Sequence, residues 1–456
     1  MHGATAQFLF TCIMKKAVLL LLATGLFSVY AQNPEKPKLI TGPVLGAVTK
    51  NTALLWIAYK GNGQNILSLE DTLSKAVYFP TGFNKINDNK GTTAMVAEFT
   101  GLEADHVYKV QYALDPLLVH PKCVFRTQAD SVVKDMNFLF GSCALLNTGA
   151  SRFIFPGFSV GIFNQMKRQH SDFMVWLGDN VYYFSKHYNS YQGMFTRNLK
   201  IRNTFPLLAD FLNNQPNYAM WDDHDYGWND ADKSFPLKDT SLAVFKGFWP
   251  NPYNSSDTLK GNYFTFRHYD AEFFMTDCRW YRDPEGDSAA AFLGAEQLAW
   301  LEDKLQHSDA TFKFICVGSQ VLNECFYGES YAKYTVERNR LFDFIADNNI
   351  KGCMFLTGDK HYAELSKKDW KGYPLYDFTS SPLTSPILPV RYLGIYKNSC
   401  SINETILYKK NFGKISISGP PDNRVCKLEL FGKGGQKKWE YYINANTLVK
   451  GEINKK

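Results

Sequence analysis

Four apolar runs of this 456-residue chain end abruptly in polar residues whose side chains could bind cations or transfer protons. The endings are Gly141-Ser142-Cys143, Gly178-Asp179-Asn180-Val181-Tyr182, Asp222-Asp223-His224-Asp225 and Gly358-Asp359-Lys360-His361. Buried strands of an α/β sheet converge at their carboxyl ends, where ligand sites are built. We therefore interpret the four endings as parts of one site.

Each ending taken alone also has an ordinary structural interpretation. A Gly-Asp pair after a strand is usually a turn, Cys143 is typical of a small buried apolar residue, and His361 is compatible with a hydrogen-bonded core position. These structural interpretations do not explain the four endings taken together, because carboxylates gathered away from water repel one another unless cations neutralise them. The chemistry that the endings indicate is metal binding.

The ligand types constrain the ions. Carboxylate, phenolate and thiolate around a hard cation suit a trivalent, iron-like metal, whereas a neighbouring oxygen or oxygen-nitrogen site suits a divalent one. Two ions about 3.5 to 4 Å apart, bridged by a carboxylate and a hydroxide, are the usual arrangement for in-line displacement at phosphorus. We therefore expect a dinuclear metal centre.

The elements that position these residues follow from the apolar patterns. Between Leu39 and Thr127, short alternating runs separated by turn residues predict a small β-sandwich, and Leu102 followed by Tyr108 resembles the corner of a fibronectin-type module. After Asp130, compact apolar runs alternate with helical stretches, which predicts β and α units around one large sheet. The predicted helices are 294–307 and 334–348, and a predicted C-terminal hairpin joins 427–431 to 439–442.

Composition excludes several classes of protein. A chain with 45% hydrophobic and 21% charged residues is neither disordered nor collagenous nor a coiled coil. The net charge of +6 comes without a basic tail or stripe, which argues against nucleic-acid specificity. The nine cysteines contain no C-x-x-C pair, so zinc-finger spacing is absent and any disulfide pairing stays open.

The N-terminal segment predicts export. Met14, Lys15 and Lys16 precede an apolar run from Ala17 to Leu26, and small residues up to Ala31 fit a signal-peptidase site. We expect a signal peptide at 1–31 with the true start at Met14, and a periplasmic or secreted mature chain without a transmembrane segment. A short membrane anchor is the alternative.

Together the four endings resemble the alkaline phosphatase D family of calcineurin-like metallophosphoesterases. The resemblance extends over nearly the whole mature chain and includes Thr276-Asp277-Cys278-Arg279 and the segment 379–384. It implies an α/β (α+β) fold: a small all-β, fibronectin- or immunoglobulin-like sandwich at 32–129, then a catalytic domain at 130–456. That domain would be a four-layer metallophosphoesterase β-sandwich flanked by helices, and the activity an alkaline phosphatase or phosphodiesterase.

The resemblance also implies a set of metal ligands. These are Cys143, Asp179, Tyr182, Asp223, Asp359 and His361. Asp179 would bridge the metals, and Cys143 and Tyr182 would bind Fe³⁺, while the second ion would be Ca²⁺, or Zn²⁺, Mn²⁺ or Mg²⁺. The chain departs from the wider superfamily by having Gly-Ser-Cys in place of an Asp-x-His motif. Asp223 stands where Asn is usual, so the second ion would be harder or held more tightly.

The implied catalytic residues are His224, Asn180 and Asp225. In the expected mechanism a metal-bound hydroxide attacks phosphorus in line, and His224 donates a proton to the leaving oxygen. Asn180, where some members carry Arg, would hydrogen-bond a phosphate oxygen, and Asp225 would orient His224. Arg279 and Arg282 either contact phosphate or pair with neighbouring aspartates.

Two rival functions remain open at this point. The same site could prefer phosphodiesters, such as phospholipid head groups or polymers, with the aromatic residues of 182–191 lining a larger leaving-group pocket. Alternatively, an exported protein could bind a glycan or surface partner without catalysis, its metals being structural. The expected substrate is a small-molecule or polymer phosphate ester, and the oligomeric state stays open.

Overall fold

A computed structural model describes residues 37–451 except 63–65, 114–119, 148–159, 254–259, 288, 326–327 and 388–397. The predicted signal peptide and its start at Met14 lie outside the described residues. Among the residues that are described, no helix has the length and apolar character needed to cross a membrane.

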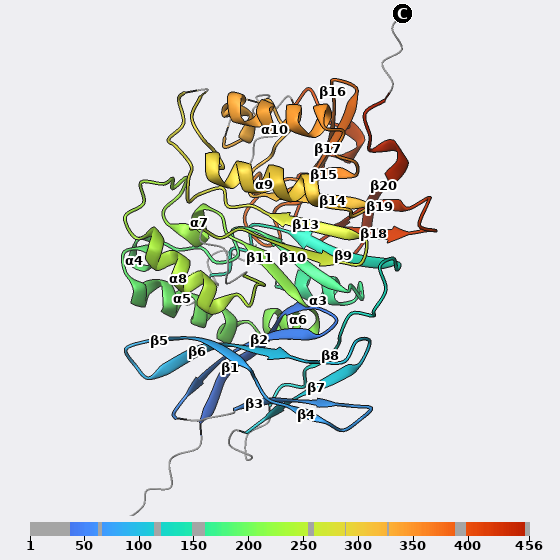
Figure 1. Cartoon of the computed structure of the whole chain (residues 1–456). Helices are drawn as coiled ribbons and strands as arrows, with labels where there is room; N and C mark the ends of the chain where they lie inside the picture. The colour runs from blue at the N-terminus through green and yellow to red at the C-terminus, as the bar shows by residue number, and fades with distance from the viewer. Residues whose placement is uncertain are drawn as a thin grey trace, which may run out of the picture.

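The N-terminal part consists of two four-stranded sheets, ordered β1-β2-β6-β5 and β4-β3-β7-β8 (Figure 1). Their strands are β1 (Lys38–Val48), β2 (Thr52–Lys60), β3 (Leu67–Asp71), β4 (Val77–Tyr78), β5 (Gly82–Asn87), β6 (Thr92–Thr100), β7 (Val107–Tyr112) and β8 (Val124–Arg126). Alternate residues such as Leu55 and Phe99 point into the core of this unit. The Tyr108 hydroxyl accepts a hydrogen bond of 2.7 Å from the Glu103 amide, which is the corner that the sequence predicts.

Two six-stranded sheets, ordered β11-β10-β9-β18-β19-β20 and β12-β13-β14-β15-β17-β16, form the rest of the described chain. The strands of the first are β9 (Met136–Gly141), β10 (Phe173–Leu177), β11 (Asn217–Met220), β18 (Asn411–Ser418), β19 (Val425–Gly432) and β20 (Lys437–Asn444). Those of the second are β12 (Phe264–His268), β13 (Ala271–Met275), β14 (Phe312–Val317), β15 (Cys353–Thr357), β16 (Glu364–Trp370) and β17 (Tyr373–Thr379). Strands β9, β10 and β11 are parallel to one another, as are β13, β14, β15 and β17.

The side chains of β10 show how the layers are built. Phe173 and Val175 face the second sheet across a buried apolar core, whereas Trp176 packs against helices on the opposite face. Trp176 lies 6.2 Å from Phe163 of α3 (Gly161–Lys167) and 6.0 Å from Phe211 of α6 (Pro206–Asn214), measured between ring centroids. Strand β10, which is apolar on both faces, is therefore covered by the second sheet on one face and by helices on the other.

Helices cover both outer faces, as Figure 1 shows. The first sheet is covered by α3 (Gly161–Lys167), α5 (Tyr191–Thr204), α6 (Pro206–Asn214) and α8 (Lys238–Phe248), and the second by α9 (Ala295–His307) and α10 (Thr335–Asp347). The expected α/β class and four-layer architecture are confirmed. The interpretation of one large sheet is wrong, because the β-α runs divide between two sheets.

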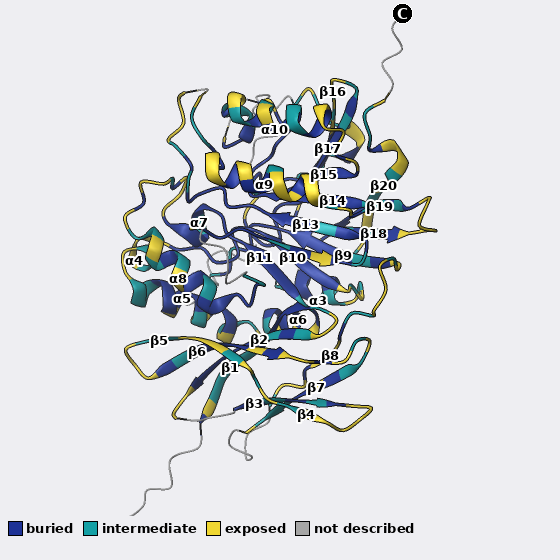
Figure 2. Ribbon diagram, in the orientation of Figure 1, coloured by how far each residue is buried: buried dark blue, intermediate teal, exposed yellow. Residues whose placement is uncertain are grey.

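The remaining elements are short, and the burial pattern in Figure 2 follows the layers. They are α4 (Ser185–Tyr188), α7 (Asp223–Tyr226) and the 3-10 turns η1 (Tyr331–Lys333), η3 (Asn403–Thr405) and η4 (Ala445–Thr447). The two six-stranded sheets lie between the helices and are mostly buried, whereas α9 and α10 each expose the face that points to solvent. Both helices and the β19-β20 hairpin lie where the sequence predicts them.

Candidate metal centre

The candidate metal ligands lie on loops at the carboxyl ends of four strands. The loops after β9, β10, β11 and β15 carry, in that order, Cys143; Asp179 and Tyr182; Asp223 and His224; and Asp359 and His361. Strands β9, β10 and β11 are neighbours in the first sheet, whereas β15 belongs to the second. The residues are thus brought together where the two sheets end side by side.

Backbone contacts hold these loops against one another. The Cys143 amide donates to the Gly178 carbonyl at 3.2 Å, and the Asp359 amide donates to the Ser142 hydroxyl at 3.2 Å. Gly178 has a φ of +94°, and a Cβ at this position would lie 2.5 Å from the Cβ of Asp222. Only glycine permits so close an approach of the β10 and β11 loops.

Left-handed backbone conformations are concentrated at this site. The residues are Cys143 (φ 58°), Asp179 (φ 55°), Asp359 (φ 67°) and His361 (φ 56°). A non-glycine residue pays a conformational cost for this geometry, and such costs cluster at functional sites where they fix side-chain directions. Four of the candidate metal ligands carry that cost.

Asp179 is the geometric centre of the cluster. Its Oδ2 accepts hydrogen bonds from the Tyr182 hydroxyl at 2.8 Å and from the Cys143 thiol at 3.6 Å, and its Oδ1 accepts from the His224 amide at 3.3 Å. One potential ligand atom each from Asp179, Asp223 and His224 lies within 4.8 Å of the others. A single cation would fit among these three donors.

The pKa values of the buried acidic groups in the cluster indicate that a bound cation would stabilise their ionised forms. Burial raises the pKa of the Asp179 carboxyl well above its ordinary value, and the nearby Asp223 carboxylate raises it further. Burial likewise raises the pKa of Asp359. The pKa values of Tyr182 and Cys143 are raised by burial and by the charge of Asp179. A bound cation would offset these costs and favour all four anionic, ligating forms.

Two histidines carry unsatisfied nitrogens. Nδ1 of His224 and Nδ1 of His361 are buried and have no hydrogen-bond partner among the described residues. Buried polar atoms are normally paired, and a neutral imidazole nitrogen is a common metal ligand. Burial lowers the pKa of His361 to about 4, which keeps its ring neutral at pH 7. Nitrogen, carboxylate, phenol and thiol donors together fit a pair of cations.

Asn180 and Asp225 lie differently from the sequence-based expectation. The Asn180 side-chain amide donates to the Met220 carbonyl at 2.8 Å, which turns it toward the loop backbone. Asp225 accepts from the backbone amides of Asn180 at 3.0 Å and Val181 at 2.8 Å. No hydrogen bond between Asp225 and the His224 ring occurs in the part of the chain that the structure describes. Both residues brace the loop that carries Asp179.

Arg279 and Arg282 belong to a buried ion-pair network. The Arg279 side chain is 0% exposed; its Nε donates to Asp222 at 2.5 Å, and its two terminal nitrogens donate to both oxygens of Glu329 at 3.0 and 2.5 Å. Arg282 also pairs with Glu329, at 2.7 Å. The guanidinium groups therefore pair with Asp222 and Glu329 rather than with Asp277 or Asp283, the aspartates next to them in the sequence.

Glu329 was missed by sequence reasoning. It lies in a loop with no strand pattern before it, so nothing in the sequence connects it with the endings of the four strands. The amine of Lys360 donates to the Glu329 carbonyl and lies 3.7 Å from Oδ2 of Asp359. The ion-pair network therefore borders the metal cluster directly.

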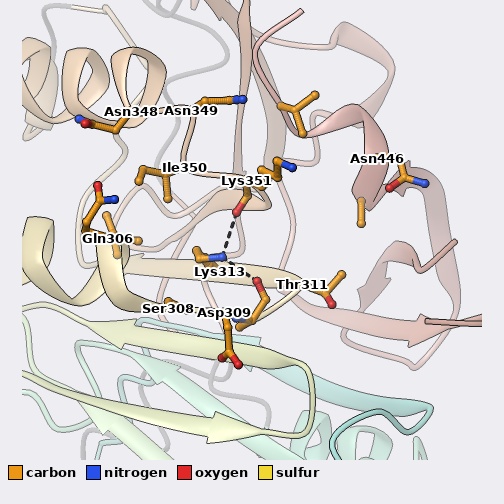
Figure 3. Close-up of a pocket in the computed structure, with 14 residues that line it drawn as sticks. Gln306, Ser308, Asp309, Thr311, Lys313, Asn348, Asn349, Ile350, Lys351 and Asn446 are labelled. Atoms are coloured by element: carbon orange, nitrogen blue, oxygen red, sulfur yellow. Dashed lines mark hydrogen bonds between the residues drawn. The ribbon is translucent and has the colours of Figure 1, made fainter. Parts of the chain in front are cut away.

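A cavity of about 680 Å³ lies elsewhere in the molecule, and Figure 3 shows it in close-up. It is located around the start of β14, at the opposite end of that strand from the cluster. There the buried Lys313 amine donates to the carbonyls of Ala310 at 2.6 Å and Lys351 at 3.1 Å. This cavity is separate from the candidate metal centre.

A family model described as PhoD-like phosphatase matches residues 138–424, a range that contains every candidate metal and catalytic residue. Among curated proteins, "Alkaline phosphatase D" of Bacillus subtilis (strain 168) is 24% identical over an alignment of 322 residues that covers 58% of this chain and 52% of that protein. The chain thus spans about half the length of the curated relative that it matches.

Among solved structures, a purple acid phosphatase isolated from yellow lupin (Lupinus luteus) seeds is similar with a TM-score of 0.62 and 11% identity. The similarity covers 90% of this chain and 74% of that one. At this identity the likeness establishes a shared fold and nothing further.

Proposed function

This chain belongs to the PhoD-like phosphatase family, and from that premise we propose that it hydrolyses phosphate esters in a metal-dependent reaction. The observation that carries the proposal is the buried pair of Asp179 and Asp223, whose carboxylate oxygens lie within 4.8 Å of each other and of a ring nitrogen of His224. The surrounding Cys143 and Tyr182 add the thiol and phenol that touch Asp179.

We propose that six residues hold two cations. Asp179 lies between two groups of donors, which supports a bridging role. On one side are Cys143 and Tyr182, whose anionic thiolate and phenolate forms would bind Fe³⁺; on the other is Asp223, which suits a divalent ion such as Ca²⁺. Asp359 and His361 complete the set. When bound, the cations would activate water and neutralise charge on the phosphoryl oxygens.

We propose that His224 is the proton donor. Its ring lies 4.1 Å from that of Tyr182, its backbone amide contacts Asp179, and its side chain is only partly buried. In hydrolysis the oxygen of water bonds to phosphorus, the ester P–O bond breaks, and His224 delivers a proton to the departing oxygen. Asn180 and Asp225 act indirectly, by fixing the loop that carries Asp179.

We also propose that the protein is exported, on the sequence of residues 14–31 alone. No disulfide joins the described cysteines, so this part of the proposal draws no support from cross-links. Amino-terminal sequencing of the protein recovered from its native host would test it. A mature chain that begins near residue 32 is the expected result, and a retained segment 14–31 would contradict it.

Metal removal provides the direct test of the proposed activity. The purified protein should hydrolyse nitrophenyl phosphate monoesters or diesters, lose this activity with a chelator, and regain it when cations are restored. Elemental analysis should find iron and one divalent ion per chain. A chelator that is already saturated with a cation is the control. Undiminished turnover by protein shown to be metal-free would overturn the proposal, and the monoester-to-diester ratio separates the two ester classes.

Tyr182 offers a spectroscopic prediction. A phenolate bound to Fe³⁺ gives a visible charge-transfer band, so the iron-loaded protein should be coloured and Tyr182→Phe should lose the phenolate part of the absorption, leaving only that of the Cys143 thiolate. Tyr183→Phe is the matched control, because the adjacent Tyr183 hydroxyl instead accepts from Asn198 at 2.7 Å. A spectrum of Tyr182→Phe that is unchanged at equal iron content would remove Tyr182 from the metal ligands.

A further inference from the structure

Three large apolar side chains are exposed on segments that contact the candidate metal centre. Phe184 is 41% exposed, Trp228 is 37% exposed and Ile387 is 40% exposed, although most apolar residues of the catalytic part are buried. We call these three residues the apolar rim. Exposed apolar groups gathered at one place on a soluble protein commonly mark a binding surface.

Each member of the rim is close to a residue of the cluster. Phe184 follows Tyr183, whose amide donates to the His224 carbonyl at 3.0 Å. Trp228 follows His224 by four residues, just beyond the end of α7. In Figure 1, α4 and α7 lie near one another on the side of the molecule that carries these loops.

Ile387 approaches from a different segment. Ser385, two residues before it, donates a hydrogen bond of 2.9 Å to the Tyr182 hydroxyl. The Ser385 amide also donates to the Cys143 carbonyl at 3.1 Å, which fixes this segment against the cluster. The rim is therefore contributed by three loops, all of which touch candidate metal or catalytic residues.

The aromatic members of the rim are held in place on one side while the other side faces solvent. The Trp228 ring packs edge-to-face against Phe235, with centroids 4.8 Å apart, and against Tyr188 at 6.2 Å. The guanidinium of Arg197 lies 5.4 Å from the centre of the Phe184 ring. Aromatic rings that are already fixed lose little freedom when a ligand contacts them, which favours binding.

We propose that the apolar rim binds the leaving group of the substrate, and that the preferred substrates are phosphate esters of alcohols bearing a flat, apolar ring. This inference rests on the proposed function. With the phosphoryl group at the cluster, the remainder of the ester extends past His224, which donates a proton to the ester oxygen, and onto Phe184 and Trp228.

The test compares three esters of primary alcohols, so that leaving-group reactivity stays nearly constant: naphthylmethyl phosphate, octyl phosphate and glycerol 3-phosphate. Trp228→Ala should lower kcat/KM for the naphthylmethyl ester about five- to tenfold more than for the glycerol ester. The difference should lie mainly in KM, because the contact exists before and during the reaction. Phe184→Ala should shift the same ratio in the same direction.

Two further variants keep the result interpretable. Trp228→Phe retains a ring and should recover most of the preference, even where Trp228→Ala is poorly folded. Phe83→Ala removes a side chain that is 47% exposed on β5 of the N-terminal unit, and it should leave all three rates unchanged.

An equal loss of kcat/KM on all three esters, or no loss, would overturn the proposal that the apolar rim binds the leaving group. A loss as large for octyl phosphate as for the naphthylmethyl ester would overturn the preference for flat rings. If the unaltered metal-loaded protein hydrolyses none of the esters, nor the nitrophenyl esters, the proposed function itself fails.

Discussion

Asp179→Asn should lower kcat/KM for phosphate ester hydrolysis by about a thousandfold or more and should reduce the metal content of the purified protein. The Asp179 carboxylate contacts the Tyr182 hydroxyl, the Cys143 thiol and the His224 amide, so it reaches both groups of proposed ligands. An amide of the same shape keeps the packing but removes the negative charge and one of the two oxygens needed to bridge cations. We expect the loss to appear in kcat as well as in kcat/KM.

The measurement pairs steady-state kinetics with elemental analysis of the same preparation. Asp210→Asn makes the same chemical change at a carboxylate whose side chain is 54% exposed and which pairs with Lys167 at 2.7 Å. That control should keep both its activity and its metals. Asp179→Asn with near-normal turnover and two bound ions would remove Asp179 from the centre of the mechanism.

Local patterns predicted much of the fold. The periodic leucines at 298, 301 and 305 correspond to the buried face of α9, and the alternation at the C-terminus corresponds to the β19-β20 hairpin. The division into two sheets was not predictable from such patterns. Strand β9 pairs with β18, whose residue Gly413 lies opposite Phe140, and apolar periodicity carries no information on which strands pair over such a separation in sequence.

The candidate site was predictable to the extent that it depends on strand ends. Polar residues after buried strands converge wherever the strands are parallel neighbours, which is the case for β9, β10 and β11. Side-chain partners were not predictable, because they depend on contacts between loops. Asp225 satisfies backbone amides of the β10 loop rather than the His224 ring, and Glu329 is placed by its pairing with Arg279.

Arg279→Met should lower the free energy of unfolding of the metal-loaded protein by about 3 to 5 kcal/mol. The substitution keeps most of the side-chain volume but leaves the carboxylates of Asp222 and Glu329 buried without this partner. Arg282 still pairs with Glu329, so part of the charge remains compensated, whereas Asp222 loses a contact of 2.5 Å. The pKa of Asp222 is already raised to about 7 by burial, and removing the guanidinium would raise it further.

Arg340→Met is a matched control for this prediction. The guanidinium of Arg340 also donates hydrogen bonds to both carboxylate oxygens of a glutamate, Glu302, at 3.0 and 2.7 Å. The side chains of Arg340 and Glu302 are 54% and 15% exposed, against 0% and 8% for Arg279 and Glu329, so water screens this pair better and the expected loss is smaller, about 1 kcal/mol. Chemical denaturation of the two variants and the parent, at equal metal content, measures the difference. Equal losses for Arg279→Met and Arg340→Met would mean that burial adds nothing to the cost of breaking the pair. The network around Glu329 would then be a peripheral contact rather than a support for the loops that carry Asp223 and Asp359.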